Sequence, residues 1–258
     1  GAVFCKKGDI LMELTANGVR LHYEVSGRGP AVVLLHGNGA NLHFFDALTT
    51  LLEPLYTVYR LDSRRHGESE KTKEISYDLL AQDTAAFIQA LGLSRPALIG
   101  SSDGGITGLL LAIGWPGLLS CAVVCGANTH PRKLKRWFYW AFRLGGMKPG
   151  QQTLRMVAQQ PDITPQQLAS IRTPVLVMAG EKDITLPGHQ REIAAAIPGA
   201  QLCILPGEGH VSYLKKPQVF LAHAGEFLRA HAGGHWERRG QKVPAMGKEG
   251  KNHDTPAI

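Results

Sequence analysis

Short apolar runs alternate along this chain with longer runs whose apolar residues recur at helical spacing. Runs rich in Val, Ile and Leu between Gly, Pro or polar residues predict strands, and the longer periodic runs predict helices. The predicted strands are 10–15, 20–25, 31–35, a run ending at 61, 96–99, 121–125, 174–180 and 201–205. The predicted helices are 43–52, 77–91, 103–113, 189–197 and 217–230. This alternation predicts a mostly parallel sheet covered by helices on both faces.

The length and the apolar content are enough for one sizeable domain. The chain has 258 residues, of which 44% are hydrophobic, and α/β chains of this size commonly stay single. We expect the domain to cover 1–233, with a short cap inserted at about 129–172. Residues 234–258 are polar, rich in Gly and without an apolar period, which predicts a disordered tail.

A G-x-S-x-G motif lies between a predicted strand and a predicted helix. It reads Gly100-Ser101-Ser102-Asp103-Gly104. A sharp turn from a strand into a helix strains the backbone at the serine and leaves its hydroxyl free, and glycines on either side allow close approach. Ser102 is therefore the candidate nucleophile, and the alternative is a serine that only caps the helix.

The residues that would activate such a serine follow in order. Asp183 comes after the strand 174–180, and His210 follows the strand 201–205 through a loop of Pro, Gly and Glu. A serine hydroxyl needs a base, and that base needs an orienting acid. Ser102, Asp183 and His210 are therefore the candidate triad, with Glu181 as the competing acid. After the strand 121–125 the chain offers no carboxylate.

An oxyanion hole requires two N–H donors beside the serine. The backbone N–H of Asp103 opens the helix, where the helix dipole assists it. The second donor is assigned to the backbone of Asn38, in the loop His36-Gly37-Asn38-Gly39 after the strand 31–35. We expect His36 to brace this loop by hydrogen bonding.

These motifs together resemble the α/β-hydrolase superfamily over about residues 9–231. A further match, Asp62-Ser63-Arg64-Arg65-His66-Gly67-Glu68-Ser69, is similar to the family's D-x-R-G-x-G-x-S loop, with Arg65 where glycine is usual. The resemblance implies the α/β-hydrolase fold: a mostly parallel eight-stranded sheet, helices on both faces and a short helical cap. His66 is expected to be structural.

Within the superfamily, the stretch around Ser102 is similar to the valacyclovir hydrolase-like, or biphenyl hydrolase-like, esterases. Gly126-Ala127-Asn128 adds to this similarity, whereas the loop at His36 departs from that group's pattern. The resemblance implies that Asp103 pairs with a substrate ammonium. The alternative is that its carboxylate only stabilises the first turn of the helix.

The expected cap contains an aromatic and basic segment, 131–144, which reads PRKLKRWFYWAFRL. One interpretation is an amphipathic helix that packs its aromatics on the core and leaves its cations in solvent. The alternatives are a pocket wall, with Trp137 and Trp140 as candidate substrate-binding residues, or a surface for membranes or a partner helix.

The composition and the spacing of motif residues limit which cofactors and binding partners are expected. No metal-ligand spacing, P-loop or complete G-x-G-x-x-G occurs, so we expect neither a metal nor another cofactor. The net charge of +7 comes without a nucleic-acid-binding signature, and no apolar run nears the roughly 18 residues of a membrane span. We expect no nucleic-acid partner and no stable membrane anchoring. Four cysteines without ligand spacing and the lack of a leader-like start predict a cytoplasmic protein; the oligomeric state stays open.

The predicted activity is that of a cofactor-independent serine hydrolase that cleaves small-molecule carboxylic esters through an acyl-enzyme. The same triad would also support C–C bond hydrolysis, lactone hydrolysis or perhydrolysis. A ligand-binding signalling protein of the same fold with low turnover is the alternative from another class.

Overall fold

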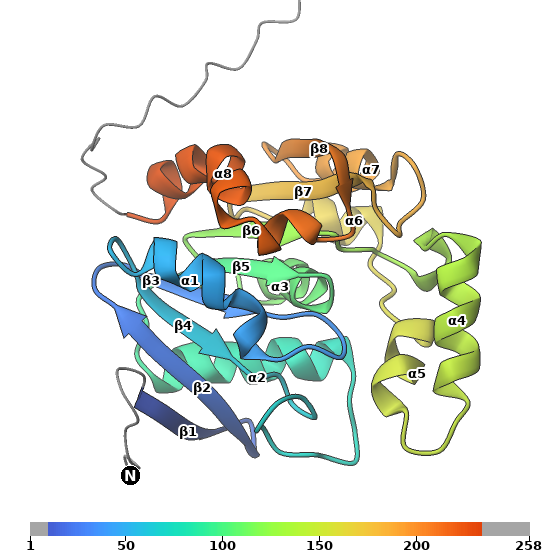
Figure 1. Cartoon of the computed structure of the whole chain (residues 1–258), viewed down its shortest axis with the longest axis horizontal. Coiled ribbons are helices and arrows are strands. Elements are labelled where there is room, and N and C mark those ends of the chain that lie inside the picture. The colour runs from blue at the N-terminus through green and yellow to red at the C-terminus, as the bar shows by residue number, and fades with distance from the viewer. Residues whose placement is uncertain (1–9, 234–258) are drawn as a thin grey trace, which may run out of the picture.

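The computed structural model describes residues 10–233, which form one eight-stranded sheet in the order β1-β2-β4-β3-β5-β6-β7-β8 (Figure 1). Strand β2 pairs antiparallel with β1 and β4, and the remaining pairs are parallel. The strands are β1 (Ile10–Ala16), β2 (Val19–Gly27), β3 (Ala31–Leu35), β4 (Thr57–Leu61), β5 (Ala97–Ser101), β6 (Cys121–Cys125), β7 (Val175–Lys182) and β8 (Gln201–Gly209). The predicted mostly parallel eight-stranded sheet is confirmed.

Helices cover both faces of the sheet, also as predicted. The helices are α1 (Asp46–Leu52), α2 (Tyr77–Ala90), α3 (Asp103–Gly114), α4 (Arg136–Gly146), α5 (Gln152–Gln159), α6 (Pro165–Ala169), α7 (His189–Ala196) and α8 (Pro217–His231). Successive strand residues point to opposite faces. Val32 and Leu34 therefore join the core under α1 and α8, whereas Val33 and Leu35 join the core under α2, α3 and α7.

The element ends differ from the predictions where tertiary contacts decide them. Strand β8 continues to Gly209 because its end still pairs with β7 beyond an irregularity between Gly180 and Lys182. The cap helix starts at Arg136 rather than near Pro131, because Leu134 forms an isolated bridge with Thr185 that holds the chain extended. A short 3-10 turn, Leu42–Phe45, precedes α1. The predicted disordered tail and the first nine residues lie outside the described residues.

Glycines allow β5 and α3 to cross closely at the motif, as predicted. A Cβ on Gly100 would overlap the carbonyl oxygen of Gly104, and a Cβ on Gly104 would overlap the carbonyl oxygen of Leu35. Both neighbours are backbone atoms, which cannot rotate away as a flexible side chain can. The helix therefore packs against the sheet at a distance that no other residue type allows here.

We expect Gly104→Ala to lower the free energy of unfolding by roughly 3 kcal/mol, because overpacking against backbone is relieved only by moving β3 or α3. Gly114→Ala is the matched control, since it lies on the same helix and its added Cβ would meet nothing within 4 Å. The control should be neutral or should gain up to about 1 kcal/mol of helix propensity. Urea unfolding of both variants measures the difference, and equal stability would contradict the close crossing.

Candidate active site

Ser102 occupies the turn between β5 and α3 with the strained backbone that the motif predicts. Its φ is 53° and its ψ is −108°, a region that residues other than glycine rarely adopt. Its backbone N–H donates to the carbonyl oxygen of Cys125 at 2.7 Å, which fixes the turn against β6. The side chain is half-buried at the carboxyl end of the sheet.

The structure brings the three predicted triad residues together. His210 Nε2 lies 3.1 Å from Ser102 Oγ, and His210 Nδ1 lies 3.1 Å from Asp183 Oδ1. With the ring protonated on Nδ1, Nδ1–H donates to the carboxylate and Nε2 accepts from the serine hydroxyl. This arrangement can take a proton from Ser102 and hold the charge that His210 then acquires.

Asp183 is buried and remains the stronger candidate acid. Burial by itself would raise its pKa, but hydrogen bonds from His210 and from the Thr185 backbone N–H outweigh burial and lower the pKa. Asp183 is therefore ionised at neutral pH and can stabilise a positively charged His210. The competitor Glu181 is exposed and instead accepts a hydrogen bond from the backbone of Gly207 at 2.8 Å.

The two backbone donors predicted for an oxyanion hole are both free. Among the described residues, neither the N–H of Asn38 nor that of Asp103 donates a hydrogen bond. The loop comes close to the serine because of Gly37, on which a Cβ would lie 3.0 Å from Ser102 Cβ. Two unpaired N–H groups beside Ser102 can stabilise negative charge that develops there.

His36 braces the Asn38 loop, as expected. Burial, with a smaller contribution from His66, lowers the pKa of His36 to about 4, so the ring is neutral. Its Nδ1–H then donates to the Gly37 carbonyl oxygen at 2.8 Å, while Nε2 accepts the Ser63 backbone N–H at 3.1 Å. The histidine thus ties the loop after β3 to the loop after β4.

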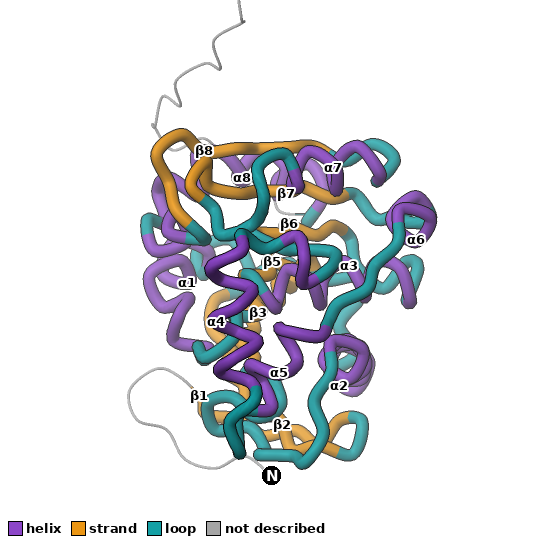
Figure 2. The backbone as a smooth tube through the Cα atoms, turned by 90° about the vertical axis from the view of Figure 1, so that its right-hand side faces the viewer, coloured by secondary structure: helices purple, strands orange, loops and turns teal. Residues whose placement is uncertain are grey.

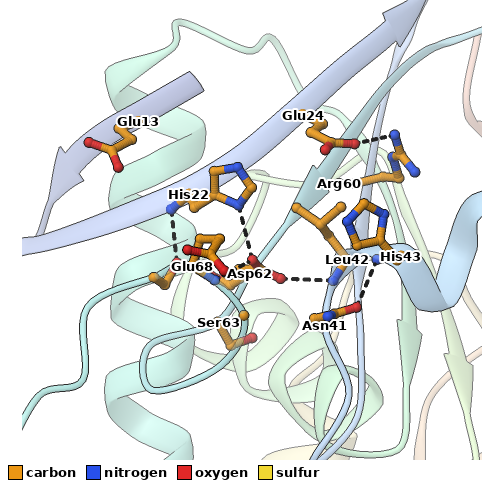
Figure 3. Close-up of polar contacts among 12 residues, drawn as sticks. Glu13, His22, Glu24, Asn41, Leu42, His43, Arg60, Asp62, Ser63 and Glu68 are labelled. Atoms are coloured by element: carbon orange, nitrogen blue, oxygen red, sulfur yellow. Dashed lines mark hydrogen bonds and ion pairs between the residues drawn. The ribbon is translucent and has the colours of Figure 1, made fainter. Parts of the chain in front are cut away.

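Asp62, the first residue of the motif after β4, connects neighbouring segments through its carboxylate (Figure 3). Asp62 Oδ1 accepts the backbone N–H of Leu42 at 2.8 Å. Its Oδ2 accepts the backbone N–H of Glu68 at 2.9 Å and lies 3.0 Å from Nδ1 of His22. One buried carboxylate therefore holds three separate segments together, which is a structural role.

Arg65 adopts the backbone conformation that explains why glycine is usual at its position. Its φ is 66°, in the left-handed region that costs a non-glycine residue about 1 kcal/mol. Its guanidinium donates to the Thr72 carbonyl oxygen and, at 3.0 Å, to Gln152 Oε1 at the start of α5. Arg65 therefore links the loop after β4 to the cap.

Asp103 is held in a network that sequence reasoning missed. Its Oδ1 accepts the hydroxyl of Tyr77 at 2.7 Å, and its Oδ2 accepts Nδ2 of Asn38 at 3.1 Å. The same Nδ2 also donates to the Thr153 carbonyl oxygen in the cap at 3.3 Å. The residue is buried, and burial raises its pKa although Tyr77 and Asn38 oppose that shift. No local signal marks Tyr77, which lies in another helix.

A pocket of about 610 Å³ lies beside the Asn38 loop. It is lined by Gly39, Ala40, Asn41, His43, Phe44, Arg65, His66, Gly67 and Thr153. The lining contains cationic and neutral polar side chains and no carboxylate. The lining includes Gly39, which follows Asn38, but none of Ser102, Asp183 and His210, so the pocket adjoins the Asn38 loop without reaching the candidate triad.

The two tryptophans of the cap do not pack on the core, so that interpretation is wrong for them. Trp137 is 79% exposed and Trp140 is 46% exposed. Neither tryptophan lines the pocket beside Asn38. The contact of α4 with α5 leaves both indole rings on the outer side of the cap.

Within residues 10–233, no group of three or more His, Cys, Asp or Glu side chains is arranged to hold a metal ion. No helix in the same part of the chain is long and apolar enough to cross a membrane. Cys121, Cys125 and Cys203 are free thiols.

Comparison with known proteins identifies the family. Residues 32–223 match the family described as "Alpha/beta hydrolase family". Serine hydrolase BPHL of Homo sapiens is 29% identical over 249 residues, covering 84% of this chain and 86% of that protein. It confirms the similarity to the biphenyl hydrolase-like esterases.

A second relative and a solved structure are also similar to this chain. An sn-1-specific diacylglycerol lipase of Mus musculus is 27% identical over 248 residues, covering 77% of this chain and 81% of the lipase. The enol-lactonase of Burkholderia xenovorans LB400 shares the fold with a TM-score of 0.73 at 23% identity, over 84% of this chain and all (100%) of that one. The chain therefore belongs to the alpha/beta hydrolase family and is a hydrolytic enzyme.

Proposed function

We propose that this hydrolase cleaves carboxylic esters through an acyl-enzyme formed on Ser102. The observation that supports this most directly is the hydrogen-bonded series Ser102–His210–Asp183, with both contacts at 3.1 Å. The two free N–H groups at Asn38 and Asp103 provide the complementary feature, a place for the oxyanion. Neither feature is needed for a serine that only caps a helix.

The reaction follows from this geometry. Ser102 Oγ attacks the ester carbonyl carbon while His210 Nε2 takes the hydroxyl proton, and the N–H groups of Asn38 and Asp103 stabilise the oxyanion. The intermediate collapses, and His210 gives the proton to the leaving alkoxide. Water, activated by His210, then attacks the acyl-enzyme and releases the acid. Asp183 orients the ring and stabilises its charge in both halves.

Two of the relatives support ester chemistry, and the comparisons together leave the substrate open. The names of two of them refer to ester bonds, a diacylglycerol and an enol-lactone. Lactone hydrolysis, C–C bond hydrolysis and perhydrolysis would use the same residues. The alternative from another class, a signalling protein with low turnover, is disfavoured because the chain belongs to a family of hydrolytic enzymes.

A fluorophosphonate probe combined with a short-chain aryl ester assay tests the proposal. The expected result is stoichiometric labelling of Ser102 together with many turnovers per enzyme. Labelling with only a single turnover would show a reactive Ser102 but would contradict carboxylic esters as the substrates. Absence of both would refute Ser102 as the nucleophile.

A second prediction concerns the charge of the preferred substrate, because the site does not favour a cation. Each oxygen of Asp103 already accepts one hydrogen bond, and the residue is only 5% exposed, so little of the carboxylate is open to a substrate ammonium. Arg65 lines the pocket beside the Asn38 loop. We therefore expect matched carboxylate and neutral esters to be hydrolysed at least as well as the ammonium ester.

The measurement is kcat/KM for the three esters at low and high salt. A carboxylate preference should shrink with salt, because exposed charges are screened over about 8 Å at physiological ionic strength. An ammonium preference of about 5-fold or more that Asp103→Asn removes would restore Asp103 as a cation site.

A further inference from the structure

Large hydrophobic side chains are exposed on the outer side of the cap. In the described part of the chain, the exposed large hydrophobic side chains are Trp137 (79%), Trp140 (46%), Leu144 (60%), Met147 (72%) and Leu186 (40%). The first four recur at helical spacing on α4 and just beyond its end, so they form one stripe. Leu186 adjoins the start of α4, because its N–H donates to the Lys133 carbonyl oxygen at 2.7 Å.

Nothing within the described residues covers this stripe. Helix α4 packs against α5 with its other side, where Phe138, Tyr139 and Phe142 are half-buried. Figure 2 looks onto this side of the molecule and shows α4 lying along the surface, with α5 beside it. Exposed apolar patches of this kind usually mark a surface that contacts a partner.

The charged residues in the segment that carries the stripe are all cationic. Residues 131–148 contain Arg132, Lys133, Lys135, Arg136, Arg143 and Lys148 and no Asp or Glu. Lys133 pairs with Glu192 at 2.7 Å. None of the other five takes part in an ion pair with any residue between 10 and 233. Arg136 and Arg143 lie next to the stripe on α4, because each is three or four residues from Trp140 and residues at this spacing are neighbours on a helix surface.

We propose that this face of the cap docks on the surface of an anionic lipid bilayer. Tryptophan prefers the depth of the lipid headgroups, and arginine and lysine beside it contact the phosphates. A second copy of the chain is a poorer partner, because it would bring two sets of unpaired cations together. The contact lies on the bilayer surface, and it does not depend on the proposed ester hydrolysis.

Co-sedimentation of the full chain with vesicles tests the proposal. The vesicles are phosphatidylcholine alone or phosphatidylcholine mixed with phosphatidylglycerol, each at low and high salt. We expect binding to the mixed vesicles, weak binding to phosphatidylcholine alone, and a loss of binding as salt increases. The full chain is used because residues beyond 233 also include cations, whose contribution the variants separate from that of α4.

Leu144→Ser/Met147→Ser should weaken binding about 10-fold by removing apolar area, and Arg136→Gln/Arg143→Gln should do so to a similar extent by removing two charges. The matched control is Arg28→Gln/Lys73→Gln, which removes the same charge from exposed positions outside the cap and should bind within about 2-fold of the parent. A thermal melt shows that each variant is folded, so the test does not depend on the proposed function.

Three results would overturn the proposal. The first is unchanged binding by the Leu144→Ser/Met147→Ser variant. The second is an equal loss in the control, which would indicate attraction by net charge alone. The third is concentration-dependent self-association in sedimentation velocity that the same apolar variant abolishes, because the stripe would then be an interface between copies.

Discussion

Ser102→Ala is expected to lower kcat/KM for a short-chain aryl ester by at least about 10⁴-fold, because it removes the attacking oxygen and leaves only binding and the oxyanion hole. The fold should be unchanged. Ser102 Oγ is half-buried and forms a hydrogen bond with His210, so its removal leaves no fully buried polar group without a partner. Initial rates and a thermal melt measure the two halves of this prediction.

Ser101→Ala is the matched control for this variant. Ser101 is adjacent, buried and at the end of β5, so its replacement should leave the rate within a few-fold of the parent. If Ser102→Ala kept more than about 1% of the parent rate, Ser101 would become the next candidate nucleophile.

Asp183→Asn is expected to lower kcat by on the order of 10⁴-fold, because an amide facing His210 favours the wrong tautomer and cannot stabilise the protonated ring. The matched control is Glu181→Gln, two residues earlier, where the carboxylate bonds to the backbone of Gly207 and not to His210. This control should stay within about 3-fold of the parent. Equal losses, or a larger loss in the control, would assign the acid to Glu181.

The fold was largely predictable because its elements depend on local patterns. Strands buried on both faces read as continuous apolar runs, and β3 and β6 occupy the predicted ranges. The turn at Ser102 was also predictable, since glycines at positions 100 and 104 are needed for a close crossing of β5 and α3. The order of Ser102, Asp183 and His210 along the chain allowed the candidate triad to be named before any distance was known.

Contacts between distant segments could not be predicted in this way. The link from Tyr77 through Asp103 to Asn38 joins three elements, and nothing in the sequence around any one residue indicates the other two. The same link changes the interpretation of Asp103, because a carboxylate that looked available to a substrate is already hydrogen-bonded and buried. The start of α4 was misplaced for a similar reason, since the pairing of Leu134 with Thr185 overrides local helix propensity.

By itself, the sequence determined the order of strands and helices, the strained turn at Ser102 and the residue types that meet at the carboxyl ends of the strands, because these follow from periodicity and from backbone sterics. Only the tertiary structure decided which side of each helix is covered by other parts of the protein. The spacing of Trp137, Trp140, Leu144 and Met147 shows that they share one side of a helix, but whether that side meets the core or the solvent depends on what packs against it. In this protein α5 takes the opposite side, and the apolar stripe is left on the surface.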